Sequence, residues 1–135
     1  MRHVLDVSVI LESTRLAFEG RMPFPQVVAA LAKSGVERYQ ADLTRLIKTH
    51  YSACGHAVSD SLPLVDAPEP AEAWSEEGVK AAIRAAQQGE IQYPEFLRRI
   101  LAAGCVAYWV FIAGRQAMYL GRRGEVHVEL FPRQR

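Results

Sequence analysis

The stretch GRMPFPQVVAALAKSGVERY, residues 20–39, returns in altered form as GEIQYPEFLRRILAAGCVAY, residues 89–108. A constant shift of 69 residues aligns the two stretches without a gap, and the alignment extends to residues 10–63 over residues 79–132. Five of the eight identical positions are glycine or proline, the residues that most strongly fix backbone geometry. The chain is therefore predicted to contain an internal repeat.

Each copy is predicted to begin with two amphipathic helices. The first helices cover residues 7–19 and 76–88, with Ser75 as the N-cap of the second of these. The second helix of each copy has apolar residues at i, i+3, i+4 and i+7, a pattern that buries one stripe. A proline opens each of these second helices, and Gly35 or Gly104 follows as a left-handed cap.

A strand meander follows the helices in each copy. The segment CVAYWVFI, residues 105–112, is almost wholly apolar and predicts a central strand. Glycines at 114 and at 121–124 are hairpin signals, and the last strand, residues 125–131, alternates polar and apolar side chains. Residues 64–74 are rich in proline and predict an extended linker between the copies.

These elements predict an α+β fold in a single domain, residues 1–135. Two helix–helix–strand-meander repeats are expected to share one antiparallel sheet of five or six strands, with the helices packed on one face. The length of the chain is typical of one hydrophobic core.

Composition excludes several classes of function. The 16 basic and 15 acidic side chains leave a formal charge of +1, which makes nucleic acid and anionic membrane poor partners. The apolar run that ends at Gly114 is too short to span a bilayer, and no signal peptide is recognisable, so a cytoplasmic location is predicted. The histidines and the two cysteines show no metal-ligand spacing, so neither metal nor cofactor is expected. His50 and His56 are expected on an exposed meander.

The candidate site residues come from the strands of the second copy. If Val126, Val128 and Leu130 of the last strand face the core, His127 and Glu129 share the other face. The aligned strands 36–43 and 105–112 are expected to bury Tyr39 and Tyr108, while Trp109 and Phe111 replace polar residues on the outer face. One sheet face is thus predicted to carry the candidate ligand-binding residues Trp109, Phe111, Tyr119, Arg122, His127 and Glu129.

Three interpretations of these residues are open. In the first, which we favour, a second subunit or the linker covers Trp109 and Phe111. The protein is then an interaction or oligomerising domain, and a homodimer is one form that it can take. In the second, Trp109 and Tyr119 wall a small-molecule pocket anchored by His127, Glu129 and Arg122. In the third and least favoured, the protein is an enzyme in which His127 is a general base oriented by Glu129.

The second copy also resembles a known family. The matching elements are AIRxxQxGxIxY at residues 82–93, AGxxxY at 103–108 and YxGRxGxxHVExFP at 119–132. These segments are similar to the small bacterial family catalogued as domain of unknown function 1398, some members of which carry a phage envelope label. The resemblance implies a stand-alone cytoplasmic bacterial protein and implies no activity. No feature of the sequence supports the phage label.

Overall fold

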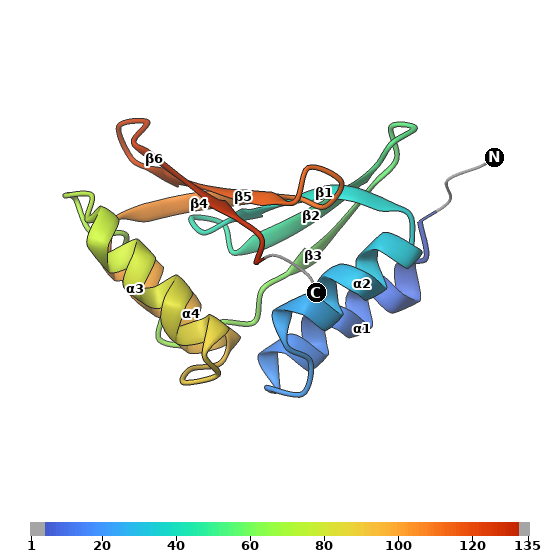
Figure 1. Cartoon of the computed structure of the whole chain (residues 1–135), viewed down its shortest axis with the longest axis horizontal. Coiled ribbons are helices and arrows are strands. Elements are labelled where there is room, and N and C mark those ends of the chain that lie inside the picture. The colour runs from blue at the N-terminus through green and yellow to red at the C-terminus, as the bar shows by residue number, and fades with distance from the viewer. Residues whose placement is uncertain (1–4, 133–135) are drawn as a thin grey trace.

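The computed structural model describes residues 5–132, and within that range it has four helices and six strands (Figure 1). Every element of the second half begins and ends 69 residues after its counterpart in the first half. The elements are α1 (Val7–Phe18), α2 (Phe24–Lys33), β1 (Val36–Asp42), β2 (Ile47–Ser52), β3 (Ala57–Ser61), α3 (Glu76–Gln87), α4 (Tyr93–Ala102), β4 (Cys105–Phe111), β5 (Gln116–Gly121) and β6 (Val126–Leu130).

The six strands form one antiparallel sheet in the order β3-β2-β1-β4-β5-β6. The two copies meet at its centre, where Tyr39 pairs with Val110 and Ala41 pairs with Tyr108. Both helix pairs lie against the same face of the sheet, α1 with α2 under one half and α3 with α4 under the other (Figure 1). The predicted α+β fold with two repeats is therefore confirmed. The other face, which we call the helix-free face, carries no helix within residues 5–132.

The helices begin and end where the sequence predicts. The hydroxyl of Ser75 accepts a hydrogen bond from the backbone N–H of Gly78 at 3.0 Å, and so caps α3. Gly35 and Gly104 take φ values of +89° and +93°, in the left-handed region that glycine tolerates best. No helix within residues 5–132 is long and apolar enough to cross a bilayer.

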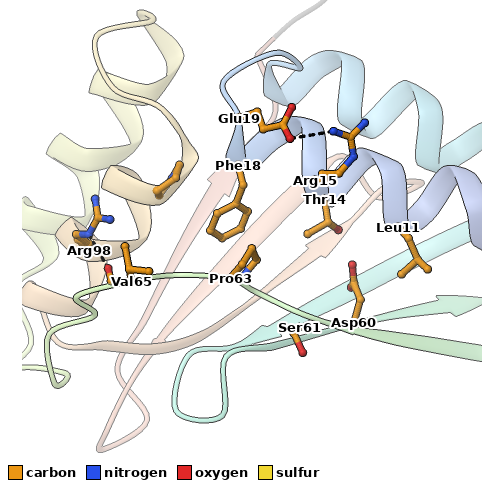
Figure 2. Close-up of a pocket in the computed structure, with 11 residues that line it drawn as sticks. Leu11, Thr14, Arg15, Phe18, Glu19, Asp60, Ser61, Pro63, Val65 and Arg98 are labelled. Carbon is orange, nitrogen blue, oxygen red and sulfur yellow. Dashed lines mark hydrogen bonds and ion pairs between the residues drawn. The ribbon is translucent and has the colours of Figure 1, made fainter.

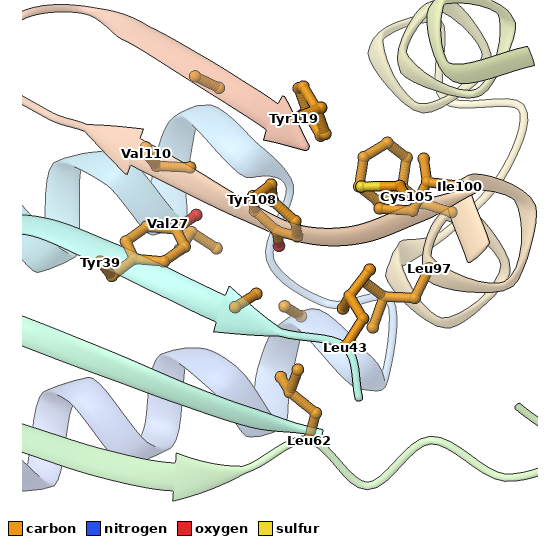
Figure 3. Close-up of a cluster of buried hydrophobic side chains, with 14 of the residues drawn as sticks. Val27, Tyr39, Leu43, Leu62, Leu97, Ile100, Cys105, Tyr108, Val110 and Tyr119 are labelled. Carbon is orange, nitrogen blue, oxygen red and sulfur yellow. The ribbon is translucent and has the colours of Figure 1, made fainter. Parts of the chain in front are cut away.

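The core lies between the sheet and the helices (Figure 3). In Figure 3, Tyr39 and Val110 of the sheet lie beside Val27 of α2, and Tyr108 lies between them and Leu97 and Ile100 of α4; all six are buried. The predicted burial of the two tyrosines is therefore confirmed. Strand alternation then decides which side chains of every paired strand face the helices.

Two predictions about side-chain direction are wrong. Val126, Val128 and Leu130 face away from the helices and are 47%, 44% and 68% exposed. Because Tyr108 faces the helices, its cross-strand partner Tyr119 does so too, and Tyr119 in turn brings the paired His127 to the same face. The register of the buried central strand thus overrides the apolar pattern of the edge strand. His50, expected on an exposed meander, is fully buried for the same reason of strand parity.

Candidate functional site

The six sequence-predicted site residues occupy three separate places. Trp109 and Phe111 lie on the helix-free face of the sheet, whereas Tyr119, His127 and Glu129 lie on the helix side. The fifth strand ends in a hairpin, from which Arg122 donates a hydrogen bond to the backbone carbonyl of Pro70 in the linker. Trp109 and Tyr119 therefore do not form opposite walls of one pocket.

His127 and Glu129 do form a pair. The Nε2 atom of His127 lies 2.9 Å from Oε1 of Glu129, and the histidine ring stacks on Tyr119 with a centroid distance of 6.4 Å. A carboxylate at this distance fixes the histidine tautomer. Among the described residues, no cysteine thiol and no serine hydroxyl forms a hydrogen bond with His127. The histidine therefore has no nucleophile of these two kinds beside it there.

The helix-free face differs sharply between the two copies. In the first copy, β1, β2 and β3 present mainly polar or small residues on it, including Gln40, Thr49 and Ser59. Their counterparts in the second copy are Trp109, Met118 and Val128. We call the second-copy half of this face the apolar patch, and its residues are Ala107, Trp109, Phe111, Gln116, Met118, Leu120, Val126, Val128 and Leu130.

Stacked rings cross the middle of the helix-free face. Trp109 stacks on Phe111 at a centroid distance of 5.8 Å and on Tyr51 of β2 at 5.9 Å. The guanidinium of Arg38 lies 4.7 Å from the Tyr51 ring centroid, at the boundary between the polar and apolar halves. Offset aromatic stacking holds these partly exposed rings in one orientation.

A second group of polar residues, which sequence reasoning did not select, lies on the helix side of the first copy. Lys48 and His50 of β2 are 2% and 0% exposed. The Lys48 ammonium lies 4.3 Å from the ring centroid of Tyr39 and 5.7 Å from that of Tyr93. Asp60 pairs with Lys48 across the β2–β3 ladder, and its Oδ1 lies 3.9 Å from Nδ1 of His50.

Burial dominates the electrostatics of this group. It lowers the pKa of Lys48 to about 8, and Asp60 acts in the opposite direction. Burial and the neighbouring Lys48 charge lower the pKa of His50 to about 3, so this histidine is neutral at pH 7. Burial raises the pKa of Asp60, while Thr14 and Lys48 oppose that change. The backbone of Val58 opposes the shift of His50 without completing a hydrogen bond to its ring.

Among residues 5–132, both ring nitrogens of His50 and Oδ1 of Asp60 are inaccessible to solvent and have no hydrogen-bond partner. Nδ1 of His50 and Oδ1 of Asp60 lie 3.9 Å apart, too far for a direct hydrogen bond. A buried polar atom without a partner costs about 1–3 kcal/mol.

A cleft of about 400 Å³ opens beside Asp60 (Figure 2). It lies between α1, the chain that follows β3, and the start of α4. Thr14 and Asp60 line its polar side, while Leu11, Phe18 and Pro63 supply apolar walls. Arg15 and Arg98 stand at two of its edges, as Figure 2 shows.

The signal for this second group was present in the repeat. The 69-residue shift places Lys48 and His50 on Ala117 and Tyr119, so two polar residues occupy positions that are buried in the other copy. Trp109, Phe111 and His127 are departures of the second copy from the repeat, and Lys48 and His50 are the matching kind of departure in the first copy.

Metal ligation has no support among residues 5–132. No group of three or more His, Cys, Asp or Glu side chains there is arranged to hold a metal ion. Cys105 is buried and donates to the carbonyl of Ala107 at 3.3 Å, and burial raises the pKa of its thiol to about 11. This thiol is therefore uncharged at pH 7.

Three bacterial proteins that carry the name uncharacterised protein are similar to this chain. Two are from strains of Mycobacterium tuberculosis and one is from Mycobacterium bovis. Each is 24% identical over 106 residues, an alignment that covers 78% of this chain and 65% of the relative. The chain thus spans less than two-thirds of the length of these relatives. No family model matches the chain.

Proposed function

We propose that this protein is an oligomerising domain that forms a homodimer through the apolar patch on the helix-free face. The observation that carries the proposal is the exposure of Val126, Val128 and Leu130 beside the stacked rings of Trp109 and Phe111. A contiguous apolar surface of this kind is typical of an interaction site in a soluble protein.

The size of the face suits a weak dimer. Six strands spaced about 4.8 Å apart, each about five residues long at about 3.3 Å per residue, give a flat area of about 500 Å² per copy. The apolar patch takes up half of this area, about 250 Å², so two patches bury about 500 Å² in total, which is below the usual size of a specific interface and indicates a weak dimer. The account therefore predicts a dimer that dissociates on dilution in the micromolar range.

The charge pattern favours a second copy as the partner. In a twofold dimer, residues near the axis face their own counterparts, so a charge there meets a like charge. None of the nine residues of the apolar patch is charged. The charged residues Arg38 and Asp42 lie on the first-copy half of the face, away from such an axis. Two sheets can then pack face to face about 10 Å apart.

Sedimentation equilibrium tests the proposal, with Val128→Glu as the variant. Val128 is 44% exposed, so glutamate is tolerated by the monomer but places like charges together in the dimer. The wild-type mass is expected to rise from monomer to dimer between about 1 µM and about 500 µM, and the variant is expected to remain monomeric.

Ser59→Glu is the matched control, because Ser59 occupies the position of Val128 in the other copy. It adds the same charge to the polar half of the same face and should leave the dimer intact. A wild-type protein that stays monomeric throughout, or equal loss of the dimer in both variants, contradicts the proposal. A dimer that survives Val128→Glu points instead to pairing through an edge strand.

We also infer a bacterial, cytoplasmic protein of the domain of unknown function 1398 family. The segments quoted above, with His127 and Glu129 in the last of them, support the family, and the relatives from mycobacteria support only the bacterial origin. Fractionation of cells that express the full-length protein tests the location: recovery in the soluble cytoplasmic fraction supports it, and recovery elsewhere contradicts it.

A further inference from the structure

We propose that a second copy of this chain adds its β6 to the β6 of the first copy, antiparallel and centred on Val128, so that the two sheets continue as one. This pairing uses the edge of the sheet, whereas the proposed dimer uses its helix-free face. The two interfaces are separate, so edge pairing goes beyond the proposed function and does not rest on it.

β6 is an edge strand, and no strand of residues 5–132 lies beyond it. The backbone N–H of Phe131 donates to the carbonyl of Arg115, and that of Gly121 donates to the carbonyl of Glu125. Because hydrogen-bonded and non-hydrogen-bonded pairs alternate in an antiparallel ladder, every second residue between these points directs its N–H and C=O groups away from β5. The residues so placed are Val126, Val128 and Leu130.

β6 lacks the devices that usually keep edge strands apart. Such strands are protected by proline, lysine, a bulge or an inward-pointing charge. The segment VHVEL of β6 contains neither proline nor lysine, and its pairing with β5 shows no shift of register. Its one acidic side chain, Glu129, is paired with His127 at 2.9 Å. The outer edge of β6 is therefore open to another strand.

The outward backbone groups set the register of the added strand. Residues that bond across an antiparallel ladder lie opposite each other, so Val128 faces the Val128 of the second copy, and Val126 faces its Leu130. On the helix side, between these apolar pairs, His127 of each copy lies opposite Glu129 of the other. Histidine and carboxylate form a favourable pair, as they do within one chain.

Side-chain complementarity selects this register among those that the backbone allows. A shift of two residues in one direction places His127 opposite the His127 of the second copy, and a shift in the other direction places Glu129 opposite its Glu129. Two carboxylates directly opposite each other destabilise a pair of strands, and two histidines gain no acid opposite them. The arrangement centred on Val128 joins unlike polar residues on one face and apolar residues on the other, so a second copy is the partner that β6 fits.

The edge of the first copy does not have this complementarity. The same alternation directs the backbone groups of Ser59, and of the residues two before and two after it, outward from β3. Pairing of β3 with itself would then place Val58 opposite Asp60, an apolar side chain against a carboxylate. β6, and not β3, is therefore the edge expected to pair with its own copy.

The centre of the sheet already joins two copies in this way. β1 and β4 pair antiparallel, edge to edge, and the equivalent residues Gln40 and Trp109 lie opposite each other. Both helix pairs remain on one face of the sheet and diverge below that junction (Figure 1). Addition of β6 to β6 repeats this twofold relation between whole molecules.

Edge pairing is expected to be weak. It forms two main-chain hydrogen bonds at each of three opposed pairs, and each of these bonds replaces bonds to water. We expect a dissociation constant of about 5 mM, tenfold above the highest concentration at which the mass of the proposed dimer is measured. Edge pairing therefore operates at high local concentration and leaves the mass below about 500 µM unchanged.

Disulfide trapping tests the register at a protein concentration of about 1 mM, with oxidised glutathione as the oxidant. Cys54 is exposed and is first replaced by serine, and His127→Cys and Glu129→Cys are made separately in that background. Opposed residues of a non-hydrogen-bonded pair have Cα atoms about 4.5 Å apart, within the range of a disulfide. The mixture of the two variants should form a cross-linked dimer about tenfold faster than either variant alone.

Two controls separate edge pairing from other contacts. Val58→Cys mixed with Asp60→Cys, the same positions on β3, should not cross-link above background. Met118→Glu places a charge in the middle of the apolar patch and removes the proposed face pairing. It should leave the cross-link between His127→Cys and Glu129→Cys unchanged, because these two positions lie on the helix side.

Val128→Cys keeps the test decisive if a substitution on the helix side prevents folding. Val128 is 44% exposed, and in the Met118→Glu background Val128→Cys should cross-link with its own copy, at a Cα separation of about 5.5 Å. Ser59→Cys, the counterpart on β3, should not. Val126→Pro removes an outward N–H and no bond to β5, so it should slow trapping about tenfold, whereas Ala57→Pro on β3 should not.

Equal rates for the mixture and for the single variants, or equal trapping of the β3 positions, overturn the proposal. Loss of the cross-link in Met118→Glu overturns the independence of the edge from the face. A trapped edge pair in a protein that stays monomeric by mass up to about 500 µM supports this inference and contradicts the proposed function, so the two fail separately.

Discussion

Single residues in the first copy carry the most unusual chemistry of the protein. Lys48 and His50 are both buried on β2, and the equivalent positions on β5 of the second copy hold Ala117 and Tyr119. Burial disfavours the charged form of each side chain and so lowers the pKa of both. Because these pKa values differ between the folded and unfolded chain, both residues make the free energy of unfolding depend on pH. The dependence has a definite sign for each residue.

His50 is predicted to make the protein sensitive to acid. In the unfolded chain its pKa is near 6.5, and in the folded protein it is about 3, so between these values only the unfolded state gains the proton. The free energy of unfolding should therefore fall by roughly 2 kcal/mol between about pH 7 and about pH 4.5 on account of this residue. Chemical denaturation at several pH values measures it.

His50→Gln should remove this part of the acid dependence, whereas His56→Gln, at an exposed histidine, should leave it unchanged. The raised pKa of Asp60 acts in the opposite direction at low pH, so the informative quantity is the difference between wild type and variant. Parallel pH profiles of wild type and His50→Gln would show that His50 is not held neutral.

Lys48 is predicted to make the protein more stable at moderately alkaline pH. Its folded pKa of about 8 lies below the ordinary value of 10.5, so the penalty for burying the charge is full below pH 8 and decreases above it. The free energy of unfolding should rise by about 2 kcal/mol from about pH 7.5 to about pH 9.5. Above that range the raised pKa values of Tyr39, Tyr93 and Tyr108 reverse the trend.

Lys48→Met keeps the length of the side chain and should abolish the alkaline rise, while Lys80→Met, at a partly exposed surface lysine, should preserve it. The result against this prediction is an alkaline rise of the same size in Lys48→Met.

At the level of elements, sequence reasoning succeeds where backbone geometry is locally encoded. Ser75 caps α3 and Gly104 ends α4 because their chemistry acts within one turn of chain. The facing of β6 could not be predicted in that way. Its apolar residues alternate correctly, but which set faces the helices depends on the register with β5, and so on Tyr108 two strands away.

Substitutions at two glycines test how closely the linker, residues 64–74, packs against the end of α4. Gly89 and Gly104 both have positive φ, but a Cβ on Gly89 meets open space, whereas one on Gly104 lies 2.6 Å from the carbonyl oxygen of Ala73. Gly89→Ala should lower the free energy of unfolding by about 1 kcal/mol, and Gly104→Ala by about 3 kcal/mol. Urea denaturation measures both, and equal losses would contradict the close approach of the linker to α4.

For the whole molecule, the repeat predicts the architecture but not the sites. Positions that match between copies, such as Tyr39 and Tyr108, specify the shared core. Positions that differ separate into two places: the apolar patch around Trp109 on the helix-free face, and the buried polar group of Lys48, His50 and Asp60. Sequence alone could identify Trp109 as a departure, but it could not place Trp109 and Tyr119 on opposite faces, because that depends on tertiary pairing.

Trp109 fluorescence gives the most direct test of the central claim, that two copies meet through the helix-free face. In a Trp74→Phe background, Trp109 is the remaining tryptophan and lies within the proposed interface. Raising the protein concentration from about 1 µM to about 500 µM should shift its emission to shorter wavelength and reduce quenching by iodide, as dimerisation removes the ring from water. Emission and quenching that do not change with concentration, while the mass doubles, would show that the copies associate through another surface.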